Sequence, residues 1–453
     1  MQAGVDGRAF IGDLKDKFML KHFALSTAMA LAIFSSALAD PGHGAEPDTQ
    51  VIYAGTLIDV EAGKTLKDRV ILIEDGIITA IGSRATIDEI DLQDDATLID
   101  MSDMTVLPGL SDSHVHLTSD ASVHGYKRLT VSTPRAAITG VVNARKTLMA
   151  GFTTVRNLGA PGFADVDLMN AVNDGDIPGP NIIPAGRSIG ITGGHCDNNL
   201  LPYEYKVTSG GVADGPWAVR AKVRENNKYG AKVIKFCGTG GVLSKGTKIG
   251  AQQFSFEEMK AIVDEAHLLG LKVAVHAHGA DGIETAIKAG VDSVEHSSLI
   301  SDEGIRLAKK NGTYLSMDIY VSDYILSEGE AAGILEESLA KERIVGKAQR
   351  ERFQAAVESG VKVAFGSDAG VYPHGQNGRQ FAYMVKWGLT PMEAIQASTI
   401  GNANLFGSAQ THGSIAVGKR ADIIAVEGNP LEDVAALEDV DFVMKDGVVY
   451  KDK

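Results

Sequence analysis

The sequence predicts an α/β protein in which a (β/α)8 TIM barrel carries a small β-sandwich domain built from both termini. Eight apolar, strand-like runs follow one another through the middle of the chain with helical patterns between several of them, which suggests eight βα units. Polar side chains gather where these strands end, and β-like segments without helices flank the region on both sides. Eight βα units close a barrel, and a doubly wound open sheet is the competing architecture.

The amino-terminal segment is predicted to be a signal peptide and not part of the fold. Lys15, Lys17 and Lys21 precede an apolar run at residues 23–38, which ends in small residues before a polar segment. This layout is typical of secretory signal peptides, and the run is short for a membrane span, so an uncleaved anchor is the weaker alternative. We expect residues 1–39 to be removed, with Met1 or Met19 as the start. The mature chain, from about residue 40, is expected to be exported to the periplasm or secreted, free of the membrane.

The net charge of the chain argues against some classes of partner. The 453 residues carry a formal net charge of -15, which argues against nucleic acid and anionic membranes as partners. The expected partners are a small-molecule or dipeptide substrate and further copies of the chain.

Two cysteines do not define a disulfide framework, so Cys196 and Cys237 are expected to be free thiols, with one bridge as the alternative.

The two ends of the mature chain have the same β-like texture. Short apolar runs at residues 51–54, 68–73 and 77–81 are separated by turn signals such as Glu74-Asp75-Gly76. Similar runs return near the carboxyl terminus, at residues 421–426, 442–444 and 448–450. We therefore expect residues 50–107 and 408–453 to form the sandwich domain together, with the barrel inserted as residues 108–407.

The barrel is predicted from alternating strands and helices. The expected strands are residues 113–117, 153–157, 181–185, 232–236, 272–276, 293–297, 313–318 and 362–367. The expected helices are residues 134–150, 216–229, 256–269, 280–289, 302–310 and 338–359. Gly270, Gly290 and Gly360 end three of these helices, as helix stop signals do.

Ionisable side chains stand at the strand ends where barrel enzymes place their chemistry. His114 and His116 lie two residues apart in the first strand and so project to one face. Four further strands carry such a group near their ends: Lys235, His276, His296 and Asp368. These groups are costly to bury unless they are paired or bound to a metal. An isolated His-x-His is usually a pair of satisfied histidines, but five strands aimed at one mouth predict a metal site.

The order His-x-His, Lys, His, His, Asp resembles the amidohydrolase superfamily of the binuclear metal type. Residues 107–112 (LPGLSD) and 413–422 (GSIAVGKRAD) resemble its entry into the barrel and its return to the β domain. Four shorter stretches resemble the exported Xaa-Pro and Xaa-Arg/Lys dipeptidase (prolidase-like) group and the related ochratoxin-hydrolysing amidohydrolases. They are residues 153–157 (TTVRN), 192–195 (TGGH), 275–279 (VHAHG) and 372–375 (YPHG).

The resemblance implies roles for the metal-site residues. His114, His116 and Asp368 would hold one divalent cation, and His276 and His296 the second, with Zn2+ the simplest choice. Lys235 would be N6-carboxylated and bridge both cations, and an apolar strand favours the neutral amine that carboxylation needs. A metal-bridging hydroxide would attack the scissile carbonyl, with Asp368 taking its proton and passing it to the leaving amine.

Other residues are expected to contact the substrate. His278 shares a face with His276 and is expected to touch the substrate or its oxyanion, with support of neighbouring ligands as the alternative. The remaining candidates are His195, Arg156, Tyr320 and Tyr372. The first two are candidates for binding a carboxylate, although a structural ion pair is at least as good an account of Arg156. The two tyrosines are candidate pocket walls, with surface aromatics as the alternative.

Four functions are compatible with the pattern. The leading one is a dipeptidase or carboxypeptidase that removes a C-terminal residue from Xaa-Arg, Xaa-Lys or Xaa-Pro substrates. The second is an amidase on non-peptide N-acyl amino acids such as ochratoxin A. An imidazolonepropionase-like cyclic amide hydrolase is disfavoured, because the mononuclear members of the superfamily lack a bridging lysine. A non-catalytic scaffold is disfavoured because all six ligand positions are filled.

Overall fold

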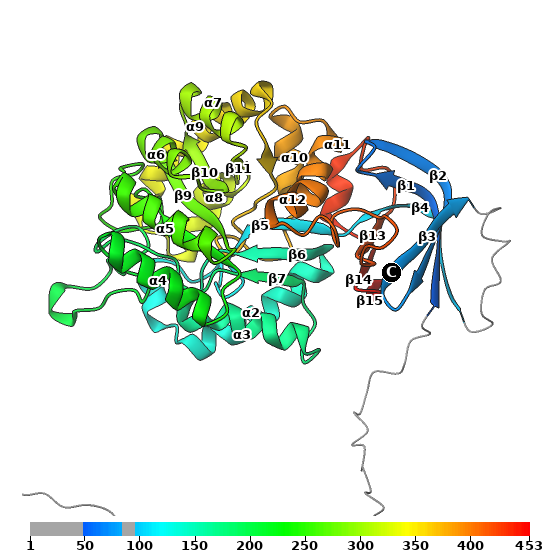
Figure 1. Ribbon diagram of the computed structural model, residues 1–453, viewed down its shortest axis with the longest axis horizontal. Coiled ribbons are helices and arrows are strands. Elements are labelled where there is room, and N and C mark those ends of the chain that lie inside the picture. The colour runs from blue at the N-terminus through cyan, green and yellow to red at the C-terminus, as the bar shows by residue number, and fades with distance from the viewer. Residues whose placement is uncertain (1–48, 84–95) are drawn as a thin grey trace, which may run out of the picture. The chain divides into compact units, whose positions relative to one another are not determined.

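The computed structural model describes residues 49–83 and 96–453 (Figure 1). The predicted signal peptide lies outside the described residues. Within the described part of the chain, no helix combines the length and the apolar composition that crossing a bilayer would require.

Strands from both ends of the chain build one seven-stranded sheet in the order β15-β14-β13-β4-β1-β2-β3. Its strands are β1 (Thr49–Asp59), β2 (Lys64–Glu74), β3 (Ile77–Ser83), β4 (Thr97–Pro108), β13 (Ile423–Val426), β14 (Phe442–Lys445) and β15 (Val448–Asp452). Alternate residues of these strands face a shared core, in which Ile52 and Ile71 pack in one cluster with Ile423 and Met444. Hydrogen bonds thus join the two terminal segments into a single sheet.

Strand β4 connects this sheet to the barrel. It runs parallel to β1 and antiparallel to β13, where Pro108 is opposite Ile423. The chain then enters β5 through Gly109, at which a Cβ atom would lie 2.3 Å from Thr153 Oγ1. Only glycine allows this close approach, so the entry to the first barrel strand is fixed by packing against the second.

Eight parallel strands form the barrel. They are β5 (Leu110–Val115), β6 (Phe152–Asn157), β7 (Asn181–Pro184), β8 (Val233–Cys237), β9 (Lys272–Gly279), β10 (Ser293–Leu299), β11 (Tyr314–Ser316) and β12 (Val363–Ala364). They pair as β5-β6-β7 and β12-β11-β10-β9-β8. Parallel bridges between Val115 and Ala369 and between Ile189 and Phe236 join the two arcs. The predicted barrel is therefore confirmed, and the open sheet is excluded.

The helices follow the strands around the outside of the barrel (Figure 1). Those expected from the sequence are α2 (Thr133–Met149), α4 (Pro216–Lys228), α5 (Phe256–Leu268), α6 (Ala280–Ala289), α7 (Asp302–Asn311) and α9 (Glu336–Ser359). Those not expected are α3 (Ala164–Asn173), α8 (Val321–Ala332), α10 (Arg379–Lys386), α11 (Pro391–Gln396) and α12 (Asn402–Phe406). Short 3-10 helices occur as η1 (Gly125–Thr130), η2 (Pro161–Phe163), η3 (Tyr203–Tyr205) and η5 (Val434–Glu438), and η4 (Ala397–Gly401) is a π-helical segment. Left-handed glycines such as Gly290 and Gly360 end α6 and α9, as predicted.

Helix α9 carries a buried carboxyl group, Glu342, that accepts a hydrogen bond from Ser322. Burial raises the pKa of Glu342 from 4.5 to about 7. The folded state therefore favours the protonated form, and stability present below pH 4.5 is lost as the pH rises through 7, by about 3 kcal/mol. We expect Glu342→Gln to raise the melting temperature at pH 8 and to change it little at pH 5. Melting temperatures of variant and wild type that differ by the same amount at every pH would contradict this. Glu351→Gln is the control, because Glu351 lies on the same helix and is more exposed.

Candidate metal centre

The first group of candidate ligands is formed where β5 and β12 meet. His114 lies on β5, His116 follows that strand, and Asp368 follows β12. Backbone hydrogen bonds from Asp368 N to His114 O and from His116 N to Ala369 O, both 2.8 Å, hold the two chain segments together. Asp368 Oδ1 then lies 3.5 Å from His114 Nε2 and 3.4 Å from His116 Nε2. These three donor atoms converge on a volume of the size that one cation needs.

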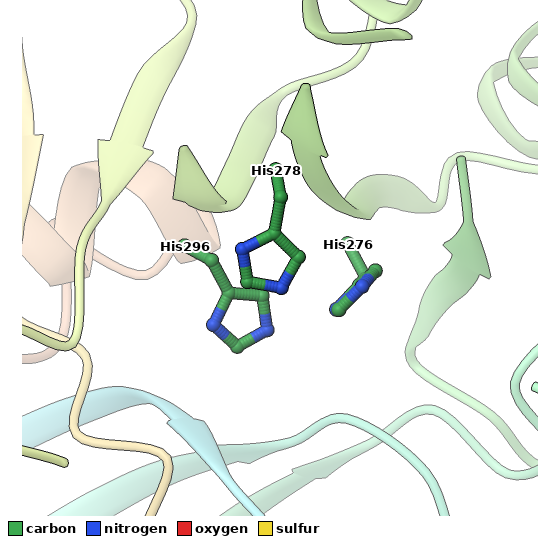
Figure 2. Close-up of side chains that lie close together, drawn as sticks. All are labelled: His276, His278 and His296. Carbon is green, nitrogen blue, oxygen red and sulfur yellow. The ribbon is translucent and has the colours of Figure 1, made fainter. Parts of the chain in front are cut away.

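A second group of three histidines lies on neighbouring strands (Figure 2). His276 and His278 project from β9 on one face, and His296 projects from β10 beside them. The rings of His278 and His296 stack at 4.9 Å, while that of His276 meets His296 edge-on at 4.6 Å. One nitrogen of each ring lies within 4.8 Å of a nitrogen of the others.

The two groups are adjacent. The ring centroids of His114 and His296 are 5.0 Å apart, and His296 also forms a close group with Asp318 and Asp368. His296 and Asp368 are therefore shared between neighbouring donor clusters. This arrangement matches a binuclear site, in which two cations lie close enough to share ligands.

Unpaired buried nitrogens show that the histidines fit a metal. Nε2 of His276 and Nε2 of His278 are buried and have no hydrogen-bond partner among the described residues. Such atoms are costly unless something coordinates them. Burial also lowers the pKa of His114 to about 4 and the pKa values of His276 and His278 well below the ordinary range. The imidazoles of His114, His276 and His278 are therefore neutral, which is the form that binds cations.

Lys235 projects from β8 into the same interior and is almost completely buried. Burial lowers the pKa of Lys235 to about 8, against the opposing influence of the nearby Glu295 and Asp368 charges. About a tenth of this lysine is consequently an uncharged amine at pH 7, far more than for an exposed lysine, and this is the form that reacts with CO2.

A buried ion pair contacts His114 of the first group of candidate ligands. Glu295 accepts a hydrogen bond of 2.8 Å from Arg156 Nη2, and its other oxygen lies 3.4 Å from His114 Nδ1. Arg156 Nε donates to Ser113 O at 2.7 Å. Burial raises the pKa of Glu295, but the Arg156 charge and the interaction with the neighbouring His114 ring outweigh it and hold the pKa below its usual range. The expectation that Arg156 binds a substrate carboxylate is not supported, because its guanidinium is buried and paired inside the barrel.

Two candidate ligands have left-handed backbone conformations. The φ angles of His296 and Asp368 are 69° and 58°, which non-glycine residues rarely adopt. Asp318 secures His296, because both of its carboxylate oxygens lie 2.9 Å from His296 Nδ1. Gln349 of α9 donates to His296 O and to Asp318 Oδ1. Strained backbone that is held in this way is concentrated at functional sites.

His195 joins the site from the loop after β7. Its ring stacks on that of His276 at 4.0 Å, with 14° between the planes, and its Nδ1 lies 2.8 Å from Ser244 Oγ. Burial lowers the pKa of His195 to about 3, so this ring is neutral as well. The structure thus brings His195 to the candidate ligands, as a substrate contact requires.

The two tyrosines lie to one side of the histidines. Tyr372 is fully buried, which excludes the surface-aromatic alternative for this residue, and its ring packs edge-on against Tyr320 at 5.0 Å. Tyr320 accepts a hydrogen bond from Arg379 at 2.9 Å and lines a cavity of about 530 Å3 next to α8 and α10. None of the candidate metal ligands lines this cavity. Burial raises the pKa of Tyr372, and the nearby Asp112 and Asp368 charges raise it further, so Tyr372 lies within electrostatic reach of one candidate ligand.

The expectation of free thiols is wrong, because Cys196 and Cys237 form a disulfide. Sequence analysis also missed the supporting roles of Glu295, Ser244 and Gln349, and it did not place Asp318 beside His296. Glu295 directly precedes His296 on the buried strand β10, and an acidic residue next to a candidate ligand in a predicted strand was the available signal. The partner of Glu295 lies 139 residues away in the sequence, so the pairing itself was not visible.

Several known proteins are similar to this chain in sequence and architecture. Residues 105–450 match the amidohydrolase family. Ochratoxinase from Aspergillus niger is 35% identical over 431 residues, which cover 90% of this chain and 87% of that protein. The crystal structure of a Xaa-Pro dipeptidase with methionine bound in its active site is 40% identical, with a TM-score of 0.84 over 89% of this chain and 100% of that one.

A third relative is a prolidase solved in complex with N-methylphosphonate-L-proline. It is 32% identical, with a TM-score of 0.81 over 89% of this chain and 100% of the prolidase. The family match covers the barrel and the carboxyl-terminal strands, and both structural relatives match over nearly their full lengths. The chain therefore belongs to the amidohydrolase family and is a hydrolytic enzyme that acts on amide or peptide bonds.

Proposed function

We propose that this protein is a binuclear metallo-dipeptidase or carboxypeptidase that releases a C-terminal amino acid from Xaa-Arg, Xaa-Lys or Xaa-Pro type substrates. The observation that carries the proposal is the convergence of the two donor groups around His296 and Asp368. The relatives that act on Xaa-Pro peptides support the substrate class.

The metal ligands in this proposal are His114, His116 and Asp368 for one cation and His276 and His296 for the other, with Zn2+ as the metal. Carboxylated Lys235 would bridge them, and its lowered pKa supports that modification. Members of the family are typically binuclear metal enzymes. When bound, the two cations make water acidic enough to be hydroxide near neutral pH and polarise the substrate carbonyl.

Three further roles are assigned to residues of the chain: proton transfer, stabilisation of the carbonyl oxygen and binding of the substrate's carboxylate. Asp368 accepts the proton of the attacking water and delivers it to the leaving amine, the combined base and acid role that its position beside both histidine groups permits. His278 is held through Nδ1 by Ser298 Oγ at 2.8 Å and leaves Nε2 directed into the site, where it would stabilise the charge that develops on the carbonyl oxygen. His195, which stacks on His276, would bind the substrate's carboxylate.

A substrate panel tests the proposal. We expect Xaa-Pro, Xaa-Arg and Xaa-Lys dipeptides to be hydrolysed with a higher kcat/KM than N-acyl amino acids. Amidation of the C-terminal carboxylate is expected to lower kcat/KM, because a carboxylate contact is lost. Dialysis against a chelator is expected to abolish activity, and Zn2+ or Co2+ with bicarbonate to restore it. Absence of hydrolysis across the panel in metal-replete protein would refute the proposal.

A second candidate function is hydrolysis of a non-peptide N-acyl amino acid such as ochratoxin A. The similarity to ochratoxinase over most of both chains favours it. Both functions use the same chemistry and differ in the acyl side of the substrate. A higher kcat/KM for ochratoxin A than for every dipeptide in the panel would decide for this candidate.

We also propose that the protein is exported. The three-part pattern of residues 1–39 supports this. Amino-terminal sequencing of the protein recovered from a fractionated host is expected to begin near residue 40. Recovery of the full-length chain in the cytoplasm would contradict export.

A further inference from the structure

The Cys196–Cys237 disulfide joins two parts of the site that are 41 residues apart in the sequence. Cys237 is the last residue of β8 and lies two positions after Lys235, so both side chains project to the same side of the strand. In the register of the sheet, Cys237 is paired with His276 on β9. Cys196 is the residue directly after His195. The disulfide therefore fastens the His195 loop to the strand that carries the candidate bridging lysine.

The loop around His195 packs without spare room. A Cβ atom at Gly190 would lie 2.7 Å from Cys196 Cβ, and one at Gly241 would lie 2.4 Å from the His195 ring and 2.6 Å from His276 Nε2. Glycines at these positions let the loops before and after β8 close on the two stacked imidazoles. A small displacement of residue 196 would therefore move His195 relative to His276.

Close to His195, the other attachments of this loop are hydrogen bonds to further loop residues. His195 N donates to Gln253 Oε1 at 3.0 Å, and its Nδ1 lies 2.8 Å from Ser244 Oγ. Asp197 accepts hydrogen bonds from Gly193 N and Ser209 N. The hydrogen-bond partners of His195 and Asp197 come from loops, whereas Ile189, six residues before His195, exchanges backbone hydrogen bonds with Lys235 and Cys237 of β8. The disulfide adds a second attachment to that strand, directly beside His195. It is the covalent link between His195 and the rigid frame of the barrel.

We propose that the Cys196–Cys237 disulfide is a positioning element that holds His195 in place for binding the substrate's carboxylate. The inference rests on the proposed function, since it assigns the disulfide to substrate binding at the same site. The proposed metal ligands His276 and Lys235 lie on barrel strands, and the positions of these strands do not depend on the disulfide. Opening the disulfide consequently weakens substrate binding while the metals stay bound.

Reduction of the folded, metal-loaded enzyme with a water-soluble phosphine tests this directly. The S–S bond breaks, the phosphine gives up two electrons and takes the oxygen of a water molecule as phosphine oxide, and the two protons of that water end on the thiols. A phosphine is used because dithiol reductants bind zinc. We expect KM for the best dipeptide to rise about tenfold, the size expected for one lost hydrogen bond to a charged group, with kcat within about twofold.

Three further measurements make the test specific. Metal content per chain is expected to stay the same on reduction, and the Kd of the released amino acid to rise with KM. The Cys196→Ala/Cys237→Ala double variant is expected to match the reduced wild type and to ignore the phosphine. In a His195→Ala background, reduction is expected to leave KM unchanged, because the group that the disulfide positions is gone.

The outcomes separate the two proposals. If the oxidised wild type hydrolyses no substrate in the panel, the proposed function fails. If it is active but reduction leaves KM and Kd unchanged, the disulfide inference alone is overturned. The inference is also overturned if metal is lost on reduction, or if reduction raises KM equally in the His195→Ala variant. Should the double variant fail to fold, reduction of the folded wild type decides.

Discussion

Lys235→Ala is expected to lower kcat/KM at least about 10³-fold and to lose bound metal. The substitution removes the side chain proposed to bridge both cations, and it leaves Glu295 and Asp368 without the nearby positive or bridging group that offsets their charge. Metal content by atomic spectroscopy and steady-state kinetics measure the two effects. Short-chain carboxylates such as acetate are expected to restore part of the activity by occupying the place of the carbamate.

Lys232→Ala is the matched control for this experiment. Lys232 directly precedes β8 and is exposed, whereas Lys235 lies near the carboxyl end of the same strand and is buried. We expect the Lys232→Ala variant to keep its metal and its activity. Two metals per chain in Lys235→Ala would show that the bridging assignment is wrong, even if the variant were inactive.

Asp368→Asn is expected to lower kcat by about 10²–10⁴-fold, the range that a positioned general acid or base contributes. The amide keeps the shape of the side chain and can still place one oxygen near His114 and His116, but it cannot carry the proton to the leaving amine. We expect much of the bound metal to remain. The kinetic effect should consequently fall on kcat more than on KM.

The pH profile separates this role from a loss of structure. The wild-type kcat is expected to depend on pH through the group that transfers the proton, and the residual activity of Asp368→Asn to lose that dependence. Asp302→Asn is the control, because Asp302 is an exposed aspartate at the start of α7 that pairs only with Arg352 in the described structure. A variant of Asp368 that turns over at the wild-type rate would remove this residue from the mechanism.

The barrel could be predicted from the sequence because its strands are apolar and its helices end in glycines. Each expected strand contains or overlaps the observed one, as at β8 and β9. Among the helices that were missed, α3 and α8 are at least as long as the predicted α6 and α7, whereas α10, α11 and α12 are short. For example, α11, η4 and α12 follow one another without a break between residues 391 and 406, and no periodic apolar stripe develops over so few residues.

The metal-site residues were visible because each stands at the end of a strand, where alternation fixes its direction. Residues whose role depends on a distant partner were not visible. Arg156 had two possible roles from sequence, and only the position of Glu295 separates them. The same holds for Cys196 and Cys237, since nothing in their spacing reveals that the loop after β7 folds back onto β8. Long-range contacts of this kind are set by the closure of the barrel.

The place of β4 between β1 and β13 has a consequence for synthesis on the ribosome. Residue 108 pairs with residue 423, so the strand that leads into the barrel is flanked on one side by a segment made more than three hundred residues later. Until that segment emerges, β4 presents an unpaired edge on which other nascent chains can add strands. A chain that stops before β13 should therefore aggregate, although it contains every residue of the metal centre.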